Sequence, residues 1–321
     1  MRQHENGAAA TRQQVAAVDV GGTSIKGALV DAELRVVEEV RRTTPRDGGP
    51  AVVVDAIAAV IGDLIAAAPA MPAAVGVAVP GIVDQEAGVA RYSANLGWRD
   101  LPLAAILADR IGLPVALGHD VRAGALAEHR MGAGRGATGI LFLPLGFGVA
   151  GAIVADGRMI RSGGHAGEIG HLVVEPGGER CGCGQLGCLE TVASAASIGR
   201  RYAARAGLPA PIGAQEVVDR VRRADAVAVA VWTEAIDALA GAITTVIAVV
   251  APSVVVVGGG LSLAGDLLLE PLRVAVEKRR TFLPLPRIVP AELGDRAGTL
   301  GAAVLALDLV ASSPSATIGA R

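Results

Sequence analysis

One segment near the N-terminus combines glycines with polar side chains as phosphate-binding loops do. Asp19 precedes the pair Gly21-Gly22, and Thr23 and Lys26 follow, between two apolar stretches. Glycines allow a tight turn that presents backbone N–H groups to a phosphate, Thr23 adds a hydroxyl donor, and Asp19 could hold a hydrated Mg²⁺ ion. The segment has neither a GxxxxGK[ST] nor a GxGxxG pattern, so a Walker A loop and a dinucleotide-binding turn are excluded. A plain Gly-Gly hairpin is the alternative.

A second group of residues has the types and spacing of a metal site. His171, Cys181, Cys183 and Cys188 follow the pattern H-x9-C-x-C-x4-C, and the chain has no other cysteine. Zinc binds four nitrogen or sulfur ligands in a tetrahedron, and the glycines of this loop would let it wrap around one ion. The pattern predicts one structural zinc ion, because four protein ligands leave no open position. The alternative to a zinc site is that the cysteines are three small buried thiols.

Acidic residues flank this metal motif on both sides. Glu168 lies three residues before His171, and Glu190 lies two residues after Cys188. Side chains packed around a metal ion are held rigidly, which suits the recognition of several hydroxyl groups at once. A solvated acidic loop is the other interpretation, and the residues alone leave both open.

His119 and Asp120 lie where a buried strand is predicted to end and a helix to begin. In open α/β sheets ligands bind at the carboxyl ends of strands, so the carboxylate of Asp120 is placed to accept a proton from an alcohol. Aspartate is also among the residues most favoured at a helix N-cap. The two roles are compatible, and the local sequence by itself favours the cap.

The elements that must position these residues alternate between strands and helices, which is typical of α/β proteins. In the first half the predicted strands are 15–20, 25–31, 34–43, 75–79 and 114–118, and the predicted helices are 51–68 and 121–131. In the second half strands are predicted at 140–145, 149–156, 253–257 and 287–289. Helical patterns dominate between residue 187 and the strand at 253–257, and a last helix is predicted at 297–310. Residues 163–187 are too irregular for regular elements.

The pattern of the two halves predicts the domain organisation. We expect a disordered polar tail at 1–14, a smaller α/β domain at 15–125, and a larger α/β domain at 126–321 that contains the zinc loop. The C-terminal helix is free to pack back on the N-terminal domain.

Composition excludes several classes of protein. Of 321 residues 52% are hydrophobic, which supplies a real core and excludes disorder. The formal net charge is −2 and aromatic residues make up 2%, so neither a nucleic-acid partner nor an anionic membrane surface is expected. The N-terminus is not a signal peptide, and polar residues and Pro252 interrupt the longest apolar stretch, 242–257, so no membrane span is predicted. Three clustered cysteines suit a reducing compartment, the cytoplasm.

Six segments, taken in order, resemble the ROK family (repressor, open reading frame, kinase), above all its bacterial glucokinase-type sugar kinases. They are DVGGTSIK, SANLGW, HD, GHAGEIGH, CGCGQLGCLE and VVVVGGG, and the resemblance extends from about residue 15 to 310. It implies the actin-like sugar-kinase fold, with two α/β domains of ribonuclease-H-like topology around a cleft. It also implies phosphoryl transfer from ATP with Mg²⁺ to the 6-hydroxyl of an aldohexose, glucose first.

The resemblance implies a role for each matching residue. Asp120 is the catalytic base, and the metal ligands bind one structural Zn²⁺. The residues implied for the sugar are Asn95, His119, Asp120, Glu168, His171 and Glu190. The residues implied for ATP are Asp19, Gly21, Gly22, Thr23 and Lys26, then Gly146, Phe147 and Gly148, and, at the turn beside the adenosine, Gly258, Gly259 and Gly260.

Two departures from the family pattern stand out. The family usually has Asn before the catalytic Asp and again two residues after it, where this chain has His119 and Arg122. The hydroxyl or 2-substituent of the sugar that is recognised there is therefore left open. The family usually has Gly-Thr-Gly where this chain has Phe147 between two glycines, and Phe offers no donor to a phosphate. We expect weakened ATP binding; the alternative is a ring packed in the core.

Other functions remain to be weighed against a glucokinase. An N-acetylglucosamine or N-acetylmannosamine kinase is the alternative within the family, and a sugar-binding pseudokinase would follow from Phe147. A transcriptional regulator is disfavoured, because only 18 residues precede Asp19 and they show no helix-turn-helix pattern. We expect a cytoplasmic homodimer or homotetramer in carbohydrate metabolism and glycolysis, whose partners are a hexose and ATP.

Overall fold

The computed structural model of the chain describes residues 13–45, 47–280 and 282–312. The chain divides into two compact units: the first comprises the residues up to Gly124 and those from Gly298 onward, and the second is Ala125–Ala297. The tail expected at 1–14 lies outside the described residues except for its last two, of which Gln14 begins the first strand.

The first unit contains a five-stranded sheet in the order β3-β2-β1-β4-β8. β1, β2 and β3 pair antiparallel, whereas β4 and β8 run parallel to β1. The central strands β1 and β4 are almost wholly buried apolar runs, as expected for strands covered on both faces. The bounds are β1 Gln14–Val20, β2 Ser24–Asp31, β3 Val36–Thr43, β4 Val75–Val79 and β8 Val115–His119.

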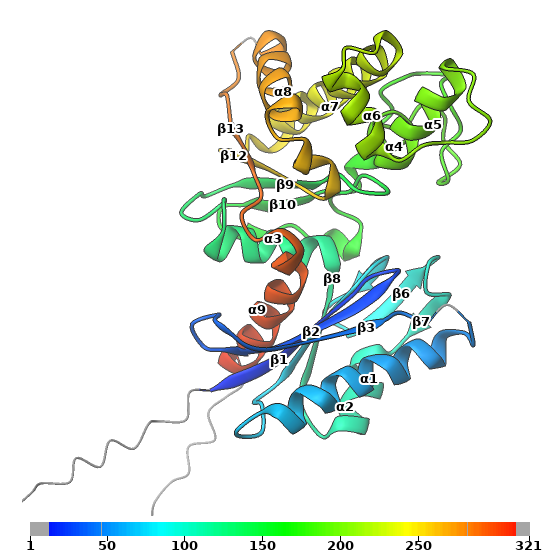
Figure 1. The fold of residues 1–321 in the computed structure, drawn as a ribbon. Coiled ribbons are helices and arrows are strands. Elements are labelled where there is room, and N and C mark those ends of the chain that lie inside the picture. The colour runs from blue at the N-terminus through cyan, green and yellow to red at the C-terminus, as the bar shows by residue number, and fades with distance from the viewer. Residues whose placement is uncertain (1–12, 46, 281, 313–321) are drawn as a thin grey trace, which may run out of the picture. The chain divides into compact units, whose positions relative to one another are not determined.

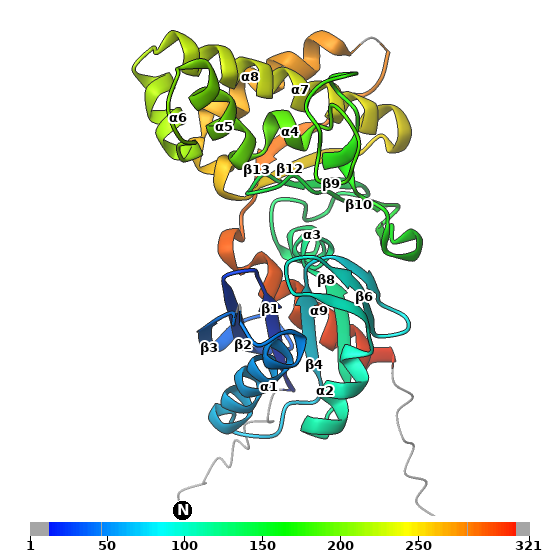
Figure 2. The ribbon, with the colours of Figure 1, turned by 90° about the vertical axis from the view of Figure 1, so that its right-hand side faces the viewer.

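Helices cover both faces of this sheet (Figures 1 and 2). α1 (Pro50–Ala67) and α2 (Leu103–Ile111) lie on one face, and α9 (Ala297–Ser312), which is distant in sequence, lies on the other. α1 begins with Pro50 at its first turn and buries residues spaced three and four apart against the sheet. α9 approaches β4 so closely that a Cβ on Gly76 would lie 1.8 Å from the carbonyl oxygen of Ala302, so only glycine fits there.

The first unit also has a three-stranded antiparallel sheet that the sequence patterns did not predict. It is formed by β5 (Ile82–Asp84), β6 (Val89–Ser93) and β7 (Trp98–Leu101). These strands are three to five residues long, with partly exposed residues among the buried ones, so their apolar pattern is too short to detect. α2, which follows directly, was missed as well; it buries only Leu103 and Leu107 fully.

The second unit repeats the topology of the first, with the strand order β11-β10-β9-β12-β13. β9, β10 and β11 pair antiparallel, and β12 and β13 run parallel to β9. β10 is shorter than the predicted 149–156, because the backbone from Gly167 to Gly170 packs directly on Val149 and Gly151. The bounds are β9 Ile140–Pro144, β10 Ala152–Ala155, β11 Arg158–Met159, β12 Val254–Gly258 and β13 Arg287–Pro290.

The helices from α4 to α8 lie on one face of the second sheet and enclose its core (Figure 1). Their bounds are α4 Glu190–Ala193, α5 Ala195–Arg205, α6 Ala214–Arg222, α7 Ala226–Val250 and α8 Asp266–Arg279. Short 3₁₀ turns occur at Ser162–Gly164, Ile169–His171, Gly260–Ala264 and Gly294–Arg296. α3 (Asp120–Met131) contains the division between the units after Gly124, and its buried Glu128 accepts hydrogen bonds from the N–H groups of Ala133 and Leu293.

Two helices, α1 and α7, are long and apolar enough to cross a membrane by length and composition. This is weak evidence for a span, because core helices pass the same test. α7 buries residues such as Trp232, Leu239 and Ile243 in the core of the second unit. The apolar stretch 242–257 is divided between the end of α7 and β12.

Candidate active site

Asp120 occupies the point where β8 passes into α3. Its Oδ1 accepts a hydrogen bond of 2.7 Å from the N–H of Val121. Burial, and after it the negative charge of Asp19, raise the pKa of Asp120 to about 7. A carboxylate with this pKa is half ionised near neutral pH, which is the condition in which a general base works best.

Asp19 lies near the carboxyl end of β1, and its carboxylate faces the first turn of α9. A Cβ on Gly298 would lie 2.6 Å from the Asp19 carboxyl carbon, so this approach requires glycine. The N-terminus of α9 therefore lies beside this carboxylate, and Nζ of Lys26 lies 3.8 Å from Asp19 Oδ2. Gly298 was missed from the sequence, since a glycine in a helical pattern gives no sign of what it approaches.

The Gly21–Thr23 segment is the tight turn between β1 and β2. The N–H of Gly21 donates to Ser24 O at 2.9 Å, and the Thr44 hydroxyl donates to Gly21 O at 2.6 Å. Gly22 and Thr23 are exposed, and nothing lies within 4 Å of the position of a Cβ on Gly22. The turn is therefore held through the N–H and the carbonyl group of Gly21 while its tip faces solvent.

Two further predicted residues belong to the first unit. Asn95 lies in the turn between β6 and β7 and is exposed. His119 is the last residue of β8 and is buried, with an exposed fraction of 9%. Burial, and after it the charge of Arg122, lower the pKa of His119 to about 3, so the ring is neutral at physiological pH.

In the second unit Glu190 stabilises the Gly146–Gly148 loop. Its Oε2 accepts a hydrogen bond of 3.0 Å from the N–H of Val149, and a Cβ on Gly148 would lie only 2.4 Å from the same oxygen. The N–H of Ala195 donates to Gly146 O at 2.9 Å, and so holds the other end of the loop. Glu190, predicted as a sugar ligand, therefore also positions the backbone of the second glycine loop.

The structure brings the two glycine segments of this unit together. Leu145 donates its N–H to Gly258 O at 2.9 Å and accepts from the N–H of Leu261 at 3.0 Å. Gly259 has φ 77° and lies against Leu145, where a Cβ would be 2.4 Å from the carbonyl oxygen. Leu145, which directly follows β9, thus connects the Gly146–Gly148 loop to the Gly258–Gly260 turn.

Phe147 projects into solvent from the glycine loop, with an exposed fraction of 88%. The alternative that its ring packs in the core is therefore wrong. The backbone around it is held by a hydrogen bond of 3.0 Å from Gly146 N–H to Gly148 O. The ring is free to meet a ligand, but it offers no donor to a phosphate.

The four residues of the metal motif converge. The ligand atoms of His171, Cys181, Cys183 and Cys188 all lie within 4.8 Å of one another. Cys181 Sγ is 3.6 Å from His171 Nδ1, and Cys183 Sγ is 3.6 Å from Cys188 Sγ. Ligands about 2.0–2.3 Å from one tetrahedral zinc ion are separated by roughly 3.3–3.8 Å, and the two pairs at 3.6 Å have this separation. Three thiols and one imidazole are also the donor types that zinc prefers, so the chemistry of the set fits zinc. Cys181 Sγ also lies 4.0 Å from Glu190 Oε1, next to the glycine loop.

An ion-pair network that the sequence did not reveal braces the metal loop. Arg201 on α5 donates to both carboxylate oxygens of Glu175, at 3.2 and 3.1 Å, and to Glu234 on α7 at 3.1 Å. These residues are 26 and 33 positions from Arg201, a separation at which no local pattern predicts a contact.

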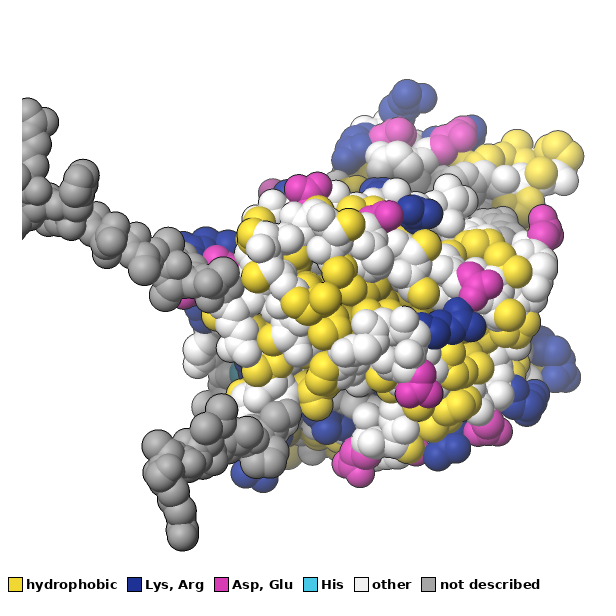
Figure 3. Space-filling view, turned by 90° about the horizontal axis from the view of Figure 1, so that it is seen from below, with side chains coloured by type: hydrophobic (Ala, Val, Ile, Leu, Met, Phe, Trp, Pro, Cys, Tyr) yellow, Lys and Arg dark blue, Asp and Glu magenta, His cyan; other side chains and the backbone are white. Residues whose placement is uncertain are grey.

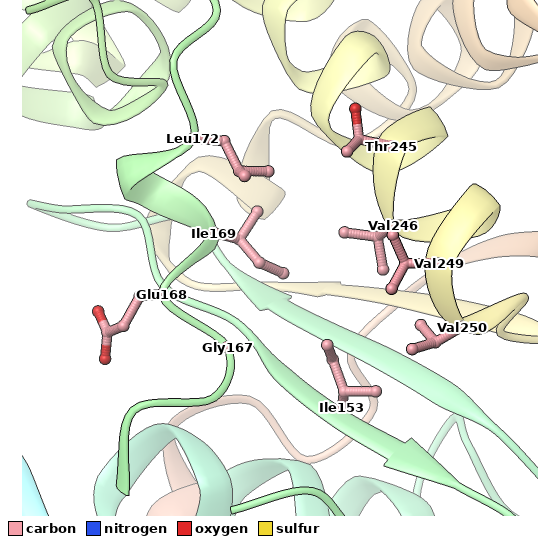
Figure 4. Close-up of a pocket in the computed structure, with 9 residues that line it drawn as sticks. All are labelled: Ile153, Gly167, Glu168, Ile169, Leu172, Thr245, Val246, Val249 and Val250. Atoms are coloured by element: carbon pink, nitrogen blue, oxygen red, sulfur yellow. The ribbon is translucent and has the colours of Figure 1, made fainter. Parts of the chain in front are cut away.

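Glu168 precedes the 3₁₀ turn that carries His171, and its side chain is exposed. A cavity of about 220 Å³ lies beside it, lined by Ile153, Gly167, Glu168, Ile169, Leu172, Thr245, Val246, Val249 and Val250. Figure 4 shows the carboxylate of Glu168 pointing away from the apolar side chains that face one another across this cavity. Walls of this kind offer few partners for hydroxyl groups, so the cavity does not suit a sugar.

The repeated strand order of the two units defines the actin-like sugar-kinase fold. The crystal structure of a ROK family glucokinase from Streptomyces griseus, in complex with glucose and AMPPNP, is similar with a TM-score of 0.80 and 31% identity, over 92% of this chain and 99% of that one. Glucokinase from Thermotoga maritima is 37% identical over 302 residues, which cover 89% of this chain and 95% of the relative. N-acetylmannosamine kinase from Shigella flexneri is 33% identical over 296 residues, 91% of this chain and 98% of the relative.

The sequence model of the ROK family matches residues 15–309. The chain belongs to the ROK family, and the resemblance drawn from the six sequence segments is confirmed.

Proposed function

We propose that this protein is an ATP-dependent glucose kinase that transfers the γ-phosphoryl group of ATP to the 6-hydroxyl of glucose. Glucokinases similar over about nine-tenths of the chain support this assignment. The observation that carries it is Asp120, whose pKa is raised to about 7 at the end of β8, with Asp19 and the exposed Gly22-Thr23 turn in the same unit.

Asp120 is the general base of the proposed reaction. Its ionised carboxylate accepts the proton of the sugar 6-hydroxyl while the oxygen attacks the γ-phosphorus. The bond between that phosphorus and the oxygen bridging to the β-phosphate breaks, and ADP leaves. Proton acceptance near pH 7 needs a carboxylate more basic than usual, and burial beside Asp19 supplies that basicity.

The glycine segments are proposed to hold ATP. The N–H groups of Gly21 and Gly146 already donate within the protein, so the tips of the two loops, at Gly22-Thr23 and at Phe147-Gly148, are the parts proposed to offer backbone N–H groups to phosphates. The Gly258–Gly260 turn is proposed to lie beside the adenosine. Asp19, paired with Lys26, is the carboxylate that would hold Mg²⁺ with its waters. The ion would neutralise negative charge on the γ-phosphoryl group that is transferred and on the phosphates of the ADP that leaves.

The residues proposed to bind the sugar hydroxyls are Asn95, His119, Asp120, Glu168, His171 and Glu190. We propose that one Zn²⁺ is held by His171 and the three cysteines, because these four donors converge as zinc requires. Its contribution would be structural: binding would hold His171 in place, and Cys181, whose Sγ lies 4.0 Å from Glu190 Oε1, would connect the metal loop to Glu190.

An N-acetylmannosamine kinase is the second candidate. The observation that favours it is the wall next to Asp120, where His119 and Arg122 are both buried in place of the family's asparagines. A changed wall could accept a changed substituent at C2 of the sugar, and one relative that is 33% identical is an N-acetylmannosamine kinase.

The proposed function also implies a location and an assembly. The glucokinases and the N-acetylmannosamine kinase reported above are sugar kinases. We therefore propose a cytoplasmic enzyme of carbohydrate metabolism, with a role in glycolysis. A homodimer or homotetramer is proposed, and light scattering on the purified protein tests it.

A sugar panel tests the proposed function. ADP release is measured with Mg·ATP and glucose, mannose, N-acetylglucosamine or N-acetylmannosamine. We expect kcat/KM to be highest for glucose. A preference for an N-acetylhexosamine would move the assignment to the second candidate, and absence of turnover with every sugar would support a sugar-binding protein without kinase activity.

A further inference from the structure

The chain passes between the two units twice, and each passage contains a residue of the proposed site or its immediate neighbour. The first passage is α3, which begins at Asp120 and crosses the division after Gly124. The second passage is the segment 291–298, which leads from β13 into α9. Its last residue, Gly298, lies against the carboxylate of Asp19. The first-unit ends of the two passages are therefore the proposed base itself and the neighbour of the proposed magnesium ligand.

The first passage carries a buried carboxylate that the proposed reaction does not use. Glu128 has an exposed fraction of 0%. Its Oε1 accepts a hydrogen bond of 2.8 Å from the N–H of Leu293, and its Oε2 accepts from the N–H groups of Ala133 and Glu292 at 2.9 and 3.3 Å. A buried carboxylate is costly unless its oxygens have partners, and here both have them. Two of the three donors belong to the second passage, 164 and 165 positions away in the sequence.

These bonds begin where the second passage leaves its sheet. Ala291 follows β13 directly, and its N–H donates to Val257 O at 2.9 Å, in continuation of the pairing with β12. The next two N–H groups along the chain are those that Glu128 accepts. Glu292 is exposed and Leu293 is half-buried, so their side chains contribute little to packing, and the hydrogen bonds to Glu128 attach this stretch to α3.

The same two helices also touch inside the first unit. A Cβ on Gly301 of α9 would lie 1.9 Å from the carbonyl oxygen of Ala123 on α3, so the two backbones meet there. Ala123 comes just before the division of the chain, and Glu128 comes shortly after it. The passages are thus connected at a point in each unit.

We propose that Glu128 is a positioning residue: it joins the two passages into one element, so that the start of α9, beside Asp19, cannot shift along α3, which begins with Asp120. This inference rests on the proposed function, in which Asp19 and Asp120 act in one phosphoryl transfer. The oxygens of Glu128 are engaged by backbone N–H groups, so the residue acts through the passages and not on a substrate. A shift of about 1 Å between groups that act together can lower kcat by as much as about 100-fold.

Two substitutions at Glu128 remove the connection to different extents. Glu128→Ala removes all three hydrogen bonds. Glu128→Gln keeps one acceptor oxygen, which takes the place of either Oε1 or Oε2. In the first case it accepts from Leu293, and in the second from Ala133 and Glu292, so a bond to the second passage is kept either way. The Gln variant should therefore lie between the wild type and the Ala variant.

Gly132→Ala disturbs the same carboxylate without replacing it. A Cβ on Gly132 would lie 2.2 Å from Glu128 Oε2, so the carboxylate must move away from its donors. Gly241→Ala, on α7 of the same unit, is the matched control, because nothing lies within 4 Å of the position of its Cβ. Tyr202→Phe is a second control: it removes a buried hydroxyl that bonds two charged side chains, and so lowers stability away from the passages.

For Glu128→Ala we expect kcat to fall about 10- to 100-fold, with the Kd for glucose, measured by calorimetry, changed less than about threefold. Glu128→Gln and Gly132→Ala should lower kcat in the same way but less, and they decide the matter if the Ala variant does not fold. Gly241→Ala and Tyr202→Phe should keep kcat within about twofold of the wild type. A wild-type kcat in Glu128→Ala overturns the proposal. An equal loss of kcat in Tyr202→Phe overturns it too, since any loss of stability would then have this effect.

Hydrogen exchange of the Leu293 amide, measured on ¹⁵N-labelled protein, tests the connection without any activity. We expect this amide to be protected in the wild type, and to exchange at least about 10-fold faster in Glu128→Ala but not in Gly241→Ala. An unprotected Leu293 amide in the wild type overturns the proposal. Protection of this amide in a wild-type protein that turns over no sugar would refute the proposed function, and not the connection between the passages.

Discussion

At the scale of single residues, Asp120 links the fold to the chemistry. It is held by the N–H of Val121 on one oxygen, and burial followed by the charge of Asp19 raises its pKa to about 7. Asp120→Asn keeps the shape and the hydrogen bond to Val121 but removes the base. We expect kcat to fall by about 10²–10⁴-fold, with a much smaller change in sugar Kd, measured by steady-state kinetics and calorimetry. Turnover near that of the wild type would leave Asp120 as a helix-capping residue alone.

The same substitution has a consequence for stability. An acid whose pKa rises from 3.8 to about 7 on folding binds its proton more tightly in the folded state. The free energy of unfolding is therefore lowered as pH rises between about 4 and 7, and stays lowered above that range. Asn does not titrate, so Asp120→Asn should be more stable than the wild type at pH 8 and equal to it at pH 4. A pKa shift of about three units corresponds to a stability difference between the variant and the wild type of at most about 4 kcal/mol at pH 8. Partial exposure of the carboxylate reduces this difference. Melting curves at both pH values measure the difference.

Phe147 is one of the two departures from the family pattern that the sequence analysis identified. It occupies the tip of the glycine loop and is 88% exposed. Phe147→Thr supplies a hydroxyl to a charged phosphate, a hydrogen bond that contributes roughly 1.5–3 kcal/mol, so kcat/KM for ATP should rise about 10- to 150-fold. The melting temperature should stay within about one degree, because no buried contact is lost. Phe147→Ala, which removes the ring without adding a donor, is the control and should show no such gain.

At the scale of elements, the metal loop and the glycine loop are coupled through Glu190. Cys183→Ser removes one of four zinc ligands, and we expect the content of about one Zn²⁺ per chain to be lost together with sugar affinity. A structural zinc contributes on the order of several kcal/mol to folding, so the melting temperature should fall as well. Gln185→Ala, an exposed residue of the same loop, should retain the metal. Elemental analysis and sugar titration decide this; metal-free protein with full stability and sugar binding would contradict it.

The contact of α9 with β4 gives a separate test of the first unit. Gly76→Ala would place a methyl group 1.8 Å from Ala302 O, so helix or strand must move, and we expect a loss of more than about 2 kcal/mol in the free energy of unfolding. Gly62→Ala is the matched control: it lies on the exposed side of α1 with nothing within 4 Å. There alanine should stabilise the helix by about 0.5–1 kcal/mol. Equal effects in the two denaturant titrations would refute this account of the packing.

The elements differ in how far the sequence could predict them. β4 and β12 are long apolar runs, and α1 is followed by Pro69, which ends the helical pattern. These local signals are strong, so the predicted bounds of the three elements agree with the structure within one or two residues. β5, β6 and β7 were missed because each is stabilised by pairing with its neighbours rather than by its own pattern. The metal ligands could be predicted from spacing within one loop. The contact of Gly298 with Asp19 could not, since it joins residues 279 positions apart that share no pattern.

At the scale of the whole molecule, one topology occurs twice. In each unit three antiparallel strands are followed by two parallel ones, so the carboxyl ends of equivalent strands carry equivalent loops. The first unit uses this edge for Asp19, the Gly22 turn and Asp120, and the second uses it for Phe147 and the Gly259 turn. The repetition explains why glycine turns follow β1, β9 and β12 alike.

Positive and negative side chains are mixed on one face of the molecule. The formal net charge is −2, and the face seen from below in Figure 3 carries Lys and Arg side chains interspersed with Asp and Glu around broad apolar areas. No excess of one sign on that face would attract a nucleic acid. The charges that matter for the proposed function are therefore local ones, at Asp19, Lys26 and Asp120.

The most direct test of the central claim is the product formed from glucose and Mg·ATP. Uniformly ¹³C-labelled glucose is incubated with the purified protein and ATP, and the carbon and phosphorus spectra are followed with time. The account predicts that a phosphate ester appears at C6, that one ADP forms for each ester, and that Asp120→Asn slows both signals together. An ester at another carbon, or ADP formation without any ester, would contradict it.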